Sequence, residues 1–258
     1  MTTPSLLKLR NISYSYHTLH GETKVLDALS LEIREGEFVA IVGPSGCGKS
    51  TLLSIIAGLL KPEDGTIVVN NPDGSLRYPR IGYMLQRDHL FEWRSVYQNV
   101  ILGLEIQHML TPDRLEKVDQ MLSDYGLANF KEKRPSELSG GMKQRAALIR
   151  TLALDPQLLL LDEPFSALDY QTRLSVSNDI CNLIRRTGKT VVLITHDLSE
   201  AIALADRVIV LGKRPATVKC ALDIHLTTGG DTSALSARNA PEFQEYLNRL
   251  WEEIRHET

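Results

Sequence analysis

The segment with the clearest capacity for chemistry is the glycine-rich stretch at residues 43–51, which reads G-P-S-G-C-G-K-S-T. It matches G-x-x-x-x-G-K-[ST] and follows the apolar run Phe38–Val42, which is typical of a buried strand. Glycines let the backbone curl so that its N–H groups point at phosphates, and a following helix adds its positive dipole end. Lys49 would place a charge on the outer phosphates, and Ser50 a hydroxyl on Mg²⁺. We therefore expect a nucleoside triphosphate to contact Gly43, Pro44, Ser45, Gly46, Cys47, Gly48, Lys49, Ser50 and Thr51.

Two carboxylates follow a second apolar run, at residues 158–161. Ligands of open α/β sheets bind outside the carboxyl ends of the strands, where Asp162 and Glu163 would lie. Asp162 is predicted to hold magnesium, and Glu163 to polarise or orient the attacking water. The alternative is an acidic surface turn, which the accompanying phosphate loop makes the weaker interpretation.

Two further polar residues come directly after predicted strands. Gln86 ends the run 81–85, and its amide oxygen could contact magnesium and the water. His196 follows the run 191–195 and could hydrogen-bond the γ-phosphate. Taken alone, each would be a plain polar residue at a strand end. The other histidines, His17 among them, are interpreted as surface residues.

A second anion site is indicated at residues 138–145, which read L-S-G-G-M-K-Q-R. Ser139, Gly140 and Gly141 stand at the start of a predicted helix, where a hydroxyl and backbone N–H groups can bind an anion. A helix cap without a ligand is the simpler alternative. Two phosphate-type sites in one chain suggest that two copies face each other head to tail and share each ATP.

The elements that must position these residues alternate between strand and helix. Strands are expected at 7–10, 29–33, 38–42, 66–70, 158–161, 191–195 and 208–211, and a turn at 71–74. Helices are expected at 49–59, 96–109, 113–125, 140–153, 170–186 and 199–205. The middle of the chain is thus a helical insertion in an α/β core. Near the end, Phe243, Leu247, Leu250 and Ile254 form one stripe of an amphipathic helix that should pack on the domain.

Composition narrows the class of protein further. The chain has 258 residues, 43% of them apolar and 24% charged, which is typical of a globular protein. A net charge of -3 leaves no basic footprint, so we expect no nucleic-acid partner. Three cysteines without ligand spacing favour a reducing compartment, and no segment reads as a secretory signal or a bilayer span. We expect a cytoplasmic protein whose membrane role would come through a partner.

Together these motifs resemble the ATP-binding subunits of ABC transporters over nearly the whole chain. The chain has the family's Walker A motif at 43–51, Q-loop at Gln86, signature at 138–142, Walker B motif at 158–163, D-loop at 166–169 and switch at His196. Met142 in the signature and Arg87-Asp88-His89 after the Q-loop depart from the commoner pattern. By this resemblance Tyr16 is the aromatic residue that stacks on adenine, with Tyr14 as the competing choice.

The resemblance implies an α/β fold: a P-loop NTPase (RecA-like) core with an inserted helical subdomain and an N-terminal antiparallel β portion. The ATP-binding core would span about 1–86 and 156–235, the helical subdomain about 87–155, and a C-terminal helix 236–258. ATP and Mg²⁺ are the implied cofactors. Two such subunits would form a homodimer on ATP binding beneath two membrane permease subunits, peripheral on the inner face of the membrane, with a solute-binding protein delivering the solute.

Two stretches point to a narrower group. Residues 90–104 (L-F-E-W-R-S-V-Y-Q-N-V-I-L-G-L) and 210–218 (V-L-G-K-R-P-A-T-V) look like the nitrate/sulfonate/taurine importers. The alternative is a soluble ABC ATPase that works without a permease, for example in cofactor assembly. A non-catalytic binding module is disfavoured because Lys49, Asp162, Glu163 and His196 are all present.

Overall fold

The computed structural model describes residues 5–19, 21–70, 78–166, 168–230 and 233–255. Contacts divide the chain into two compact units. Unit 1 comprises Met1–Pro79 and Cys181–Thr258, and unit 2 comprises Arg80–Ile180. The turn expected at 71–74 and Ala167 of the D-loop lie outside the described residues.

Unit 1 begins with an antiparallel sheet in the order β2-β1-β4, formed by β1 (Ser5–Thr18), β2 (Gly21–Arg34) and β4 (Asp64–Val69). β1 and β2 are much longer than the strands predicted at 7–10 and 29–33. Their pairing continues through polar residues as far as Thr18↔Gly21, where no apolar alternation marks a strand. The hairpin ladder, and not burial, therefore maintains the extended backbone at this end.

The second group of strands in unit 1 contains β7 (Thr190–Ile194), β3 (Phe38–Val42), β8 (Arg207–Leu211) and β9 (Val218–Asp223), in that order. β3 pairs in parallel with both β7 and β8, and β9 is antiparallel to β8. Every residue of β3, β7 and β8 is buried, as their continuous apolar runs predicted. β9 was not predicted, although Val218, Cys220 and Leu222 alternate with Lys219, Ala221 and Asp223; the strand is short, and Leu222 alone among these residues is buried.

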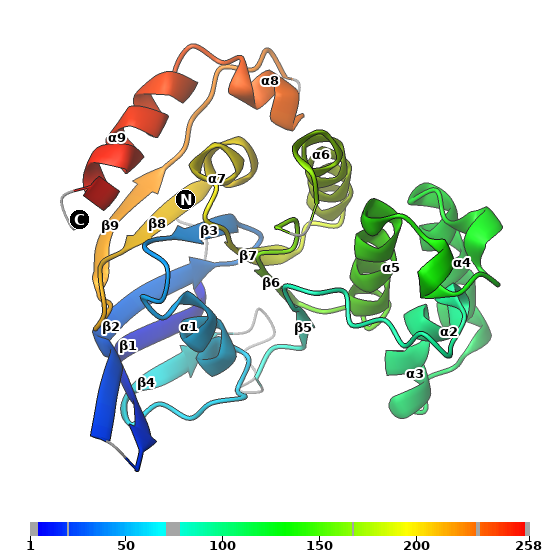
Figure 1. The fold of residues 1–258 in the computed structure, drawn as a ribbon, viewed down its shortest axis with the longest axis horizontal. Coiled ribbons are helices and arrows are strands. Elements are labelled where there is room, and N and C mark those ends of the chain that lie inside the picture. The colour runs from blue at the N-terminus through cyan, green and yellow to red at the C-terminus, as the bar shows by residue number, and fades with distance from the viewer. Residues whose placement is uncertain (1–4, 20, 71–77, 167, 231–232, 256–258) are drawn as a thin grey trace. The chain divides into compact units, whose positions relative to one another are not determined.

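The described helices of unit 1 are α1 (Lys49–Ile56), α7 (Leu198–Leu204), α8 (Ala234–Arg238) and α9 (Phe243–Arg255). α1 ends three residues before its predicted end, because Gly58 adopts a left-handed conformation and its N–H bonds to Ile55 O. The amphipathic tail helix is confirmed. α9 contacts α7 and β8 (Figure 1). Phe243 and Leu250 of this helix are buried.

Unit 2 pairs β5 (Ile81–Met84) in parallel with β6 (Leu158–Asp162) and carries the helices of the middle of the chain. These are α2 (Val96–Val100), α3 (Leu102–Ile106), α4 (Pro112–Asp124) and α5 (Gly140–Leu152), with short 3₁₀ turns at Ala128–Phe130 and Pro135–Glu137. The single helix predicted at 96–109 is interrupted at Ile101, so it forms α2 and α3. α6 (Tyr170–Arg186) connects unit 2 to the last part of unit 1. Within the described ranges, no helix has the length and apolar character needed to cross a bilayer.

Candidate nucleotide-binding site

The phosphate loop connects the end of β3 to the start of α1. Gly48 caps α1 with φ of 118°, and a Cβ at this position would lie 2.6 Å from Cγ1 of Val25. A Cβ on Gly43 would lie 2.7 Å from the carbonyl oxygen of Leu211. Any larger residue at either position would clash, so the packing around the loop itself requires glycine.

Lys49 is buried, and its ammonium group binds the backbone at the start of the phosphate loop. Nζ donates hydrogen bonds to the carbonyl oxygens of Gly43 at 2.8 Å and Pro44 at 2.9 Å. The first N–H groups of α1 follow directly, and such groups have no acceptor within their own helix. The loop therefore combines a positive charge with a helix N-terminus, the combination that binds phosphate.

Tyr16 lies beside the first turn of α1. Its hydroxyl is 3.3 Å from Oγ1 of Thr51, and 43% of its surface is exposed. The ring of Tyr14 packs edge-on against Tyr16 with centroids 5.1 Å apart. Of the two tyrosines, the structure places Tyr16 next to the phosphate loop and gives it the exposed ring.

His196 comes immediately after β7, the parallel neighbour of β3. The pair Ile41↔Ile194 sets both strand ends at the same edge, so the phosphate loop and His196 emerge together. His196 is exposed, and the next residue, Asp197, caps α7 by accepting a hydrogen bond from Glu200 N. This cap holds the backbone next to His196 in place.

Unit 2 brings Gln86 and the two carboxylates together. The pair Met84↔Leu161 aligns the ends of β5 and β6, and Asp162 is buried at the end of β6. The side-chain amide of Gln86 donates to Oε2 of Glu163 at 3.2 Å. Glu163 itself has φ of 45°, a left-handed conformation that is rare for glutamate. Such backbone strain is concentrated at functional sites.

Ser166 completes this turn, and its residue type alone predicted no role for it. Its hydroxyl donates to the carbonyl oxygen of Glu163 at 3.0 Å, and Gln86 Nε2 lies 3.4 Å from the same hydroxyl. Within the sequence, only its position in the D-loop pointed to Ser166. Its contacts with Glu163 and Gln86 depend on the turn after β6, which the residue types do not reveal.

Ser139 is the N-cap of α5, and its hydroxyl accepts a hydrogen bond from Met142 N at 3.4 Å. Gly140 is exposed, whereas a Cβ on Gly141 would lie 3.0 Å from Cγ2 of Val176. The expected helix start is thus confirmed, and Ser139 caps it in the single chain, before any second copy is bound.

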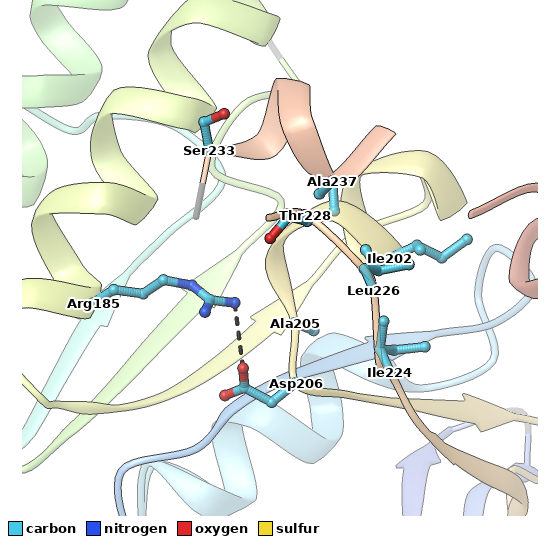
Figure 2. Close-up of a pocket in the computed structure, with 10 residues that line it drawn as sticks. Arg185, Ile202, Ala205, Asp206, Ile224, Leu226, Thr228, Ser233 and Ala237 are labelled. Carbon is cyan, nitrogen blue, oxygen red and sulfur yellow. Dashed lines mark hydrogen bonds and ion pairs between the residues drawn. The ribbon is translucent and has the colours of Figure 1, made fainter. Parts of the chain in front are cut away.

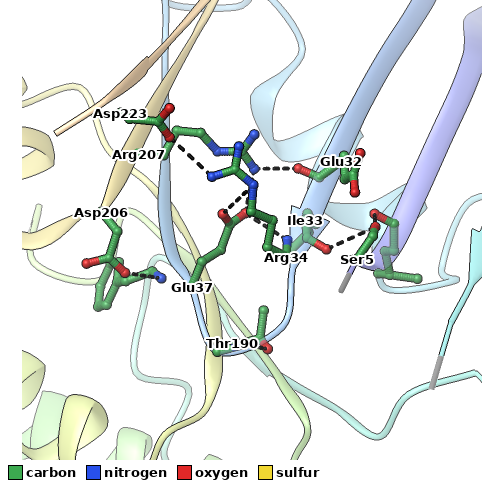
Figure 3. Close-up of polar contacts among 12 residues, drawn as sticks. Ser5, Glu32, Ile33, Arg34, Glu37, Thr190, Asp206, Arg207 and Asp223 are labelled. Atoms are coloured by element: carbon green, nitrogen blue, oxygen red, sulfur yellow. Dashed lines mark hydrogen bonds and ion pairs between the residues drawn. The ribbon is translucent and has the colours of Figure 1, made fainter. Parts of the chain in front are cut away.

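Two cavities in unit 1 lie away from these motifs. One, of about 160 Å³, is lined by residues of α7, α8 and the segment after β9, and Arg185 and Asp206 form an ion pair of 3.3 Å at its edge (Figure 2). The other is polar and includes the buried ion pair of Arg207 with Glu37 (Figure 3). The described lining of both cavities contains none of the motif residues.

The fold and motifs define a P-loop nucleotide-binding cassette, and comparison with known proteins identifies its family. The family model for ABC transporters matches residues 26–166. The uncharacterised ABC transporter ATP-binding protein YtlC of Bacillus subtilis is 41% identical over 250 residues, which are 97% of this chain and 96% of YtlC.

Two named import proteins are similar to the same extent. The taurine import ATP-binding protein TauB of a Jannaschia species is 40% identical, covering 95% of this chain and 94% of TauB. The nitrate import ATP-binding protein NrtD of a Synechocystis species is 39% identical, covering 95% and 93% respectively.

A solved structure shows the same cassette fold. The dimeric structure of a post-hydrolysis state of the ATP-binding cassette MJ0796, bound to ADP and phosphate, is 32% identical with a TM-score of 0.71, covering 85% of this chain and 99% of that chain. The chain belongs to the ABC transporter family and is an ATP-hydrolysing cassette of that family. The predicted α/β P-loop NTPase fold is confirmed.

Proposed function

We propose that this chain is the ATP-hydrolysing subunit of an importer for a small solute. The observation that carries the proposal is that the chain has all of the side chains that ATP hydrolysis needs. Some lie in unit 1 and the others in unit 2, and within each unit hydrogen bonds hold them in place. Lys49 lies over the phosphate loop in unit 1, and Glu163 is held by Gln86 in unit 2. A binding module without turnover would need neither Glu163 nor the residue that holds it.

We assign roles to these residues as follows. The loop 43–51 binds the phosphates, Tyr16 stacks on adenine, and His196 contacts the γ-phosphate. Glu163 orients or deprotonates the attacking water. Ser50, Asp162 and Gln86 each carry an oxygen of the kind that Mg²⁺ prefers, and we assign them as its ligands; the ion would neutralise phosphate charge when bound.

A homodimer formed on ATP binding is the second part of the proposal. Ser139, Gly140 and Gly141 of one copy would contact the ATP that is held by the phosphate loop of the other. The exposed position of Ser139 at the N-terminus of a 13-residue helix supports this role, as does the dimeric MJ0796 cassette. We also propose the division into an ATP-binding core at about 1–86 and 156–235, a helical subdomain at about 87–155 and a C-terminal helix at 236–258.

The partner at the membrane would be a permease, with a solute-binding protein delivering the solute to it. Unit 2 presents an exposed aromatic pair suited to such a contact. Trp93 is 73% exposed, and the centroid of its ring lies 4.6 Å from that of Phe91. Exposed apolar patches of this kind mark interaction sites.

Hydrogen bonds from Asn99 and Arg150 hold the loop that carries this pair. Asn99 is fully buried, donates to the carbonyl oxygens of Phe91 and Ser95 at 3.0 Å each, and accepts from Phe91 N at 2.7 Å. Arg150 donates to the carbonyl oxygens of Asp88 at 2.6 Å and His89 at 2.7 Å. An apolar pair on so well-anchored a loop is preorganised for binding.

The solute is proposed to be of the nitrate, sulfonate or taurine kind. The stretches 90–104 and 210–218 and the similarity to TauB and NrtD support this class. The alternative, an ABC ATPase that works without a permease, would leave the pair Phe91 and Trp93 without a partner of this kind.

The test is co-expression with candidate permease subunits, followed by purification and ATPase measurement with nitrate, taurine and alkanesulfonates. We expect a complex whose ATPase activity rises with the correct solute and its binding protein. Trp93→Ala should reduce co-purification while the basal ATPase of the isolated chain stays unchanged. Trp251→Ala, at a tryptophan of unit 1 that is 51% exposed, is the matched control. ATPase activity without any permease association would favour the alternative.

A further inference from the structure

A cluster of three ligand-forming side chains lies at the polar end of the β1–β2 hairpin. His17 on β1 and Glu22 on β2 are direct cross-strand partners. Glu63 precedes β4, and its N–H bonds to the carbonyl oxygen of Ser13 on β1 at 3.0 Å. Three segments of the antiparallel sheet therefore each contribute one side chain, and backbone hydrogen bonds fix all three.

The ligand atoms of these side chains already point toward one another. One atom from each of His17, Glu22 and Glu63 lies within 4.8 Å of the other two, and among the described residues this is the one His, Cys, Asp and Glu group with such spacing. Nε2 of His17 is 2.6 Å from Oε1 of Glu63. Ser15 orients Glu22 by donating to its Oε1 at 2.6 Å. All three side chains are exposed, so an ion could enter without a change of fold.

We propose that His17, Glu22 and Glu63 form a binding site for a divalent transition-metal ion, with Zn²⁺ the best match. Zinc accepts imidazole nitrogen and carboxylate oxygen at about 2.0–2.2 Å, and three protein ligands leave a coordination position for water. The imidazole favours such ions over Mg²⁺, which prefers a set of oxygens. Ligand atoms within 4.8 Å of one another can reach a common ion through rotation of exposed side chains.

Zinc binds the neutral imidazole, and the hydrogen bond to Glu63 raises the pKa of His17 above its ordinary value. The binding experiment is therefore done at about pH 8, where a proton competes less with the ion for the imidazole nitrogen.

The proposed site is separate from the Mg²⁺ that accompanies ATP. Tyr16 is adjacent to His17 on β1, and successive side chains of a strand point to opposite faces. A bound ion would join β1, β2 and the segment before β4 on the face of β1 opposite to Tyr16. It would therefore stabilise this end of the sheet without contributing to the phosphate-binding groups.

Zinc binding to the nucleotide-free full chain, carrying no histidine tag, tests the proposal by isothermal titration calorimetry. We expect one Zn²⁺ per chain and a rise in the thermal unfolding midpoint of wild type. Loss of a ligand in His17→Ala or Glu63→Gln should lower the affinity by at least about tenfold, because even groups that only support metal ligands contribute that much. His225→Ala, at another exposed histidine of unit 1, should bind as wild type does.

Two results would overturn the site: no saturable zinc binding by the wild-type chain, or equal affinity in His17→Ala and His225→Ala. Circular dichroism of each variant checks that the fold is retained, as expected for exposed side chains. Mg²⁺ in place of Zn²⁺ should give no comparable effect, and an equal shift of the midpoint by Mg²⁺ would contradict a transition-metal site.

Discussion

The side-chain amide of Gln86 holds the carboxylate of Glu163 through a hydrogen bond of 3.2 Å. The two residues are 77 positions apart and meet because β5 and β6 are parallel neighbours. One is the proposed ligand of magnesium and water, and the other is the proposed general base. Their contact links the Q-loop to the proposed general base, so a movement of Gln86 would also move the carboxylate of Glu163.

Gln86→Ala should therefore lower kcat more than it raises the KM for ATP. A hydrogen bond to a charged group contributes about 1.5–3 kcal/mol, which corresponds to a decrease of about 10–100-fold in rate if it is needed in the transition state. Steady-state ATPase kinetics check this. Gln98→Ala, at an exposed glutamine of the same unit, is the control, and equal kcat values in the two variants would remove Gln86 from this role.

Glu163→Gln should retain ATP binding and lose turnover. The amide cannot accept the proton of water, and general-base groups contribute about 10²–10⁴-fold. We expect an ATP-bound dimer to accumulate, which size-exclusion chromatography with ATP would detect. Turnover near the wild-type rate would exclude Glu163 as the base.

Gly48→Ala should weaken both ATP binding and the fold. The left-handed backbone costs about 1–3 kcal/mol for a residue with a side chain, and the new Cβ would also clash with Val25. Gly58→Ala is the matched control, because Gly58 has φ of +73° and no atom within 4 Å of the added Cβ. Urea unfolding and nucleotide titration should show a larger loss at Gly48, and equal losses would mean that the contact with Val25 has no effect.

Ser139→Arg should abolish ATP-driven dimerisation while the monomer still binds ATP. The long cation would occupy the N-terminus of α5, where the proposed second contact with ATP forms. Analytical ultracentrifugation with and without ATP measures the change, and Ser123→Arg on the exposed surface of α4 is the control. If nucleotide affinity of the monomer collapsed instead, Ser139 would belong to the primary site and not to a shared one.

Arg207→Met should destabilise the protein in a pH-dependent manner. Burial raises the pKa of Glu37, so the folded state binds its proton more tightly than the unfolded state does. That contribution to stability is present at acidic pH and is lost as pH rises through the raised pKa.

Removing the buried partner should cost about 3 kcal/mol near pH 7, because an uncompensated carboxylate is left in the interior. The loss should shrink toward the ordinary carboxyl pKa of about 4.5, where Glu37 can take up a proton. Urea unfolding of wild type and variant near pH 7 and near pH 4.5 measures this difference in the free energy of unfolding. The double variant with Glu37→Gln should recover part of the stability, and a loss that does not change with pH would contradict the assignment.

The sequence by itself determined the phosphate loop, the polar residues after the apolar strands and the helical middle of the chain. These features are local, since the glycines, the buried runs and the helix starts each lie within about ten neighbouring residues. The same locality explains the errors. The polar end of the β1–β2 hairpin has no apolar pattern of its own and is extended because its two strands pair with each other. Strand β9 has only a short alternation of Val218, Cys220 and Leu222, and pairing with β8 supports its extended backbone.

Tertiary structure decided the contacts between distant residues. No sequence pattern indicates that Gln86 meets Glu163, or that His17 meets Glu63 across 46 positions. Strand pairing makes both contacts possible, because β5 pairs with β6 directly before Gln86 and Glu163, and β1, which carries His17, pairs with β4, which Glu63 precedes. The residue types therefore defined which chemistry is possible, and strand pairing within each unit determined which of those residues act together.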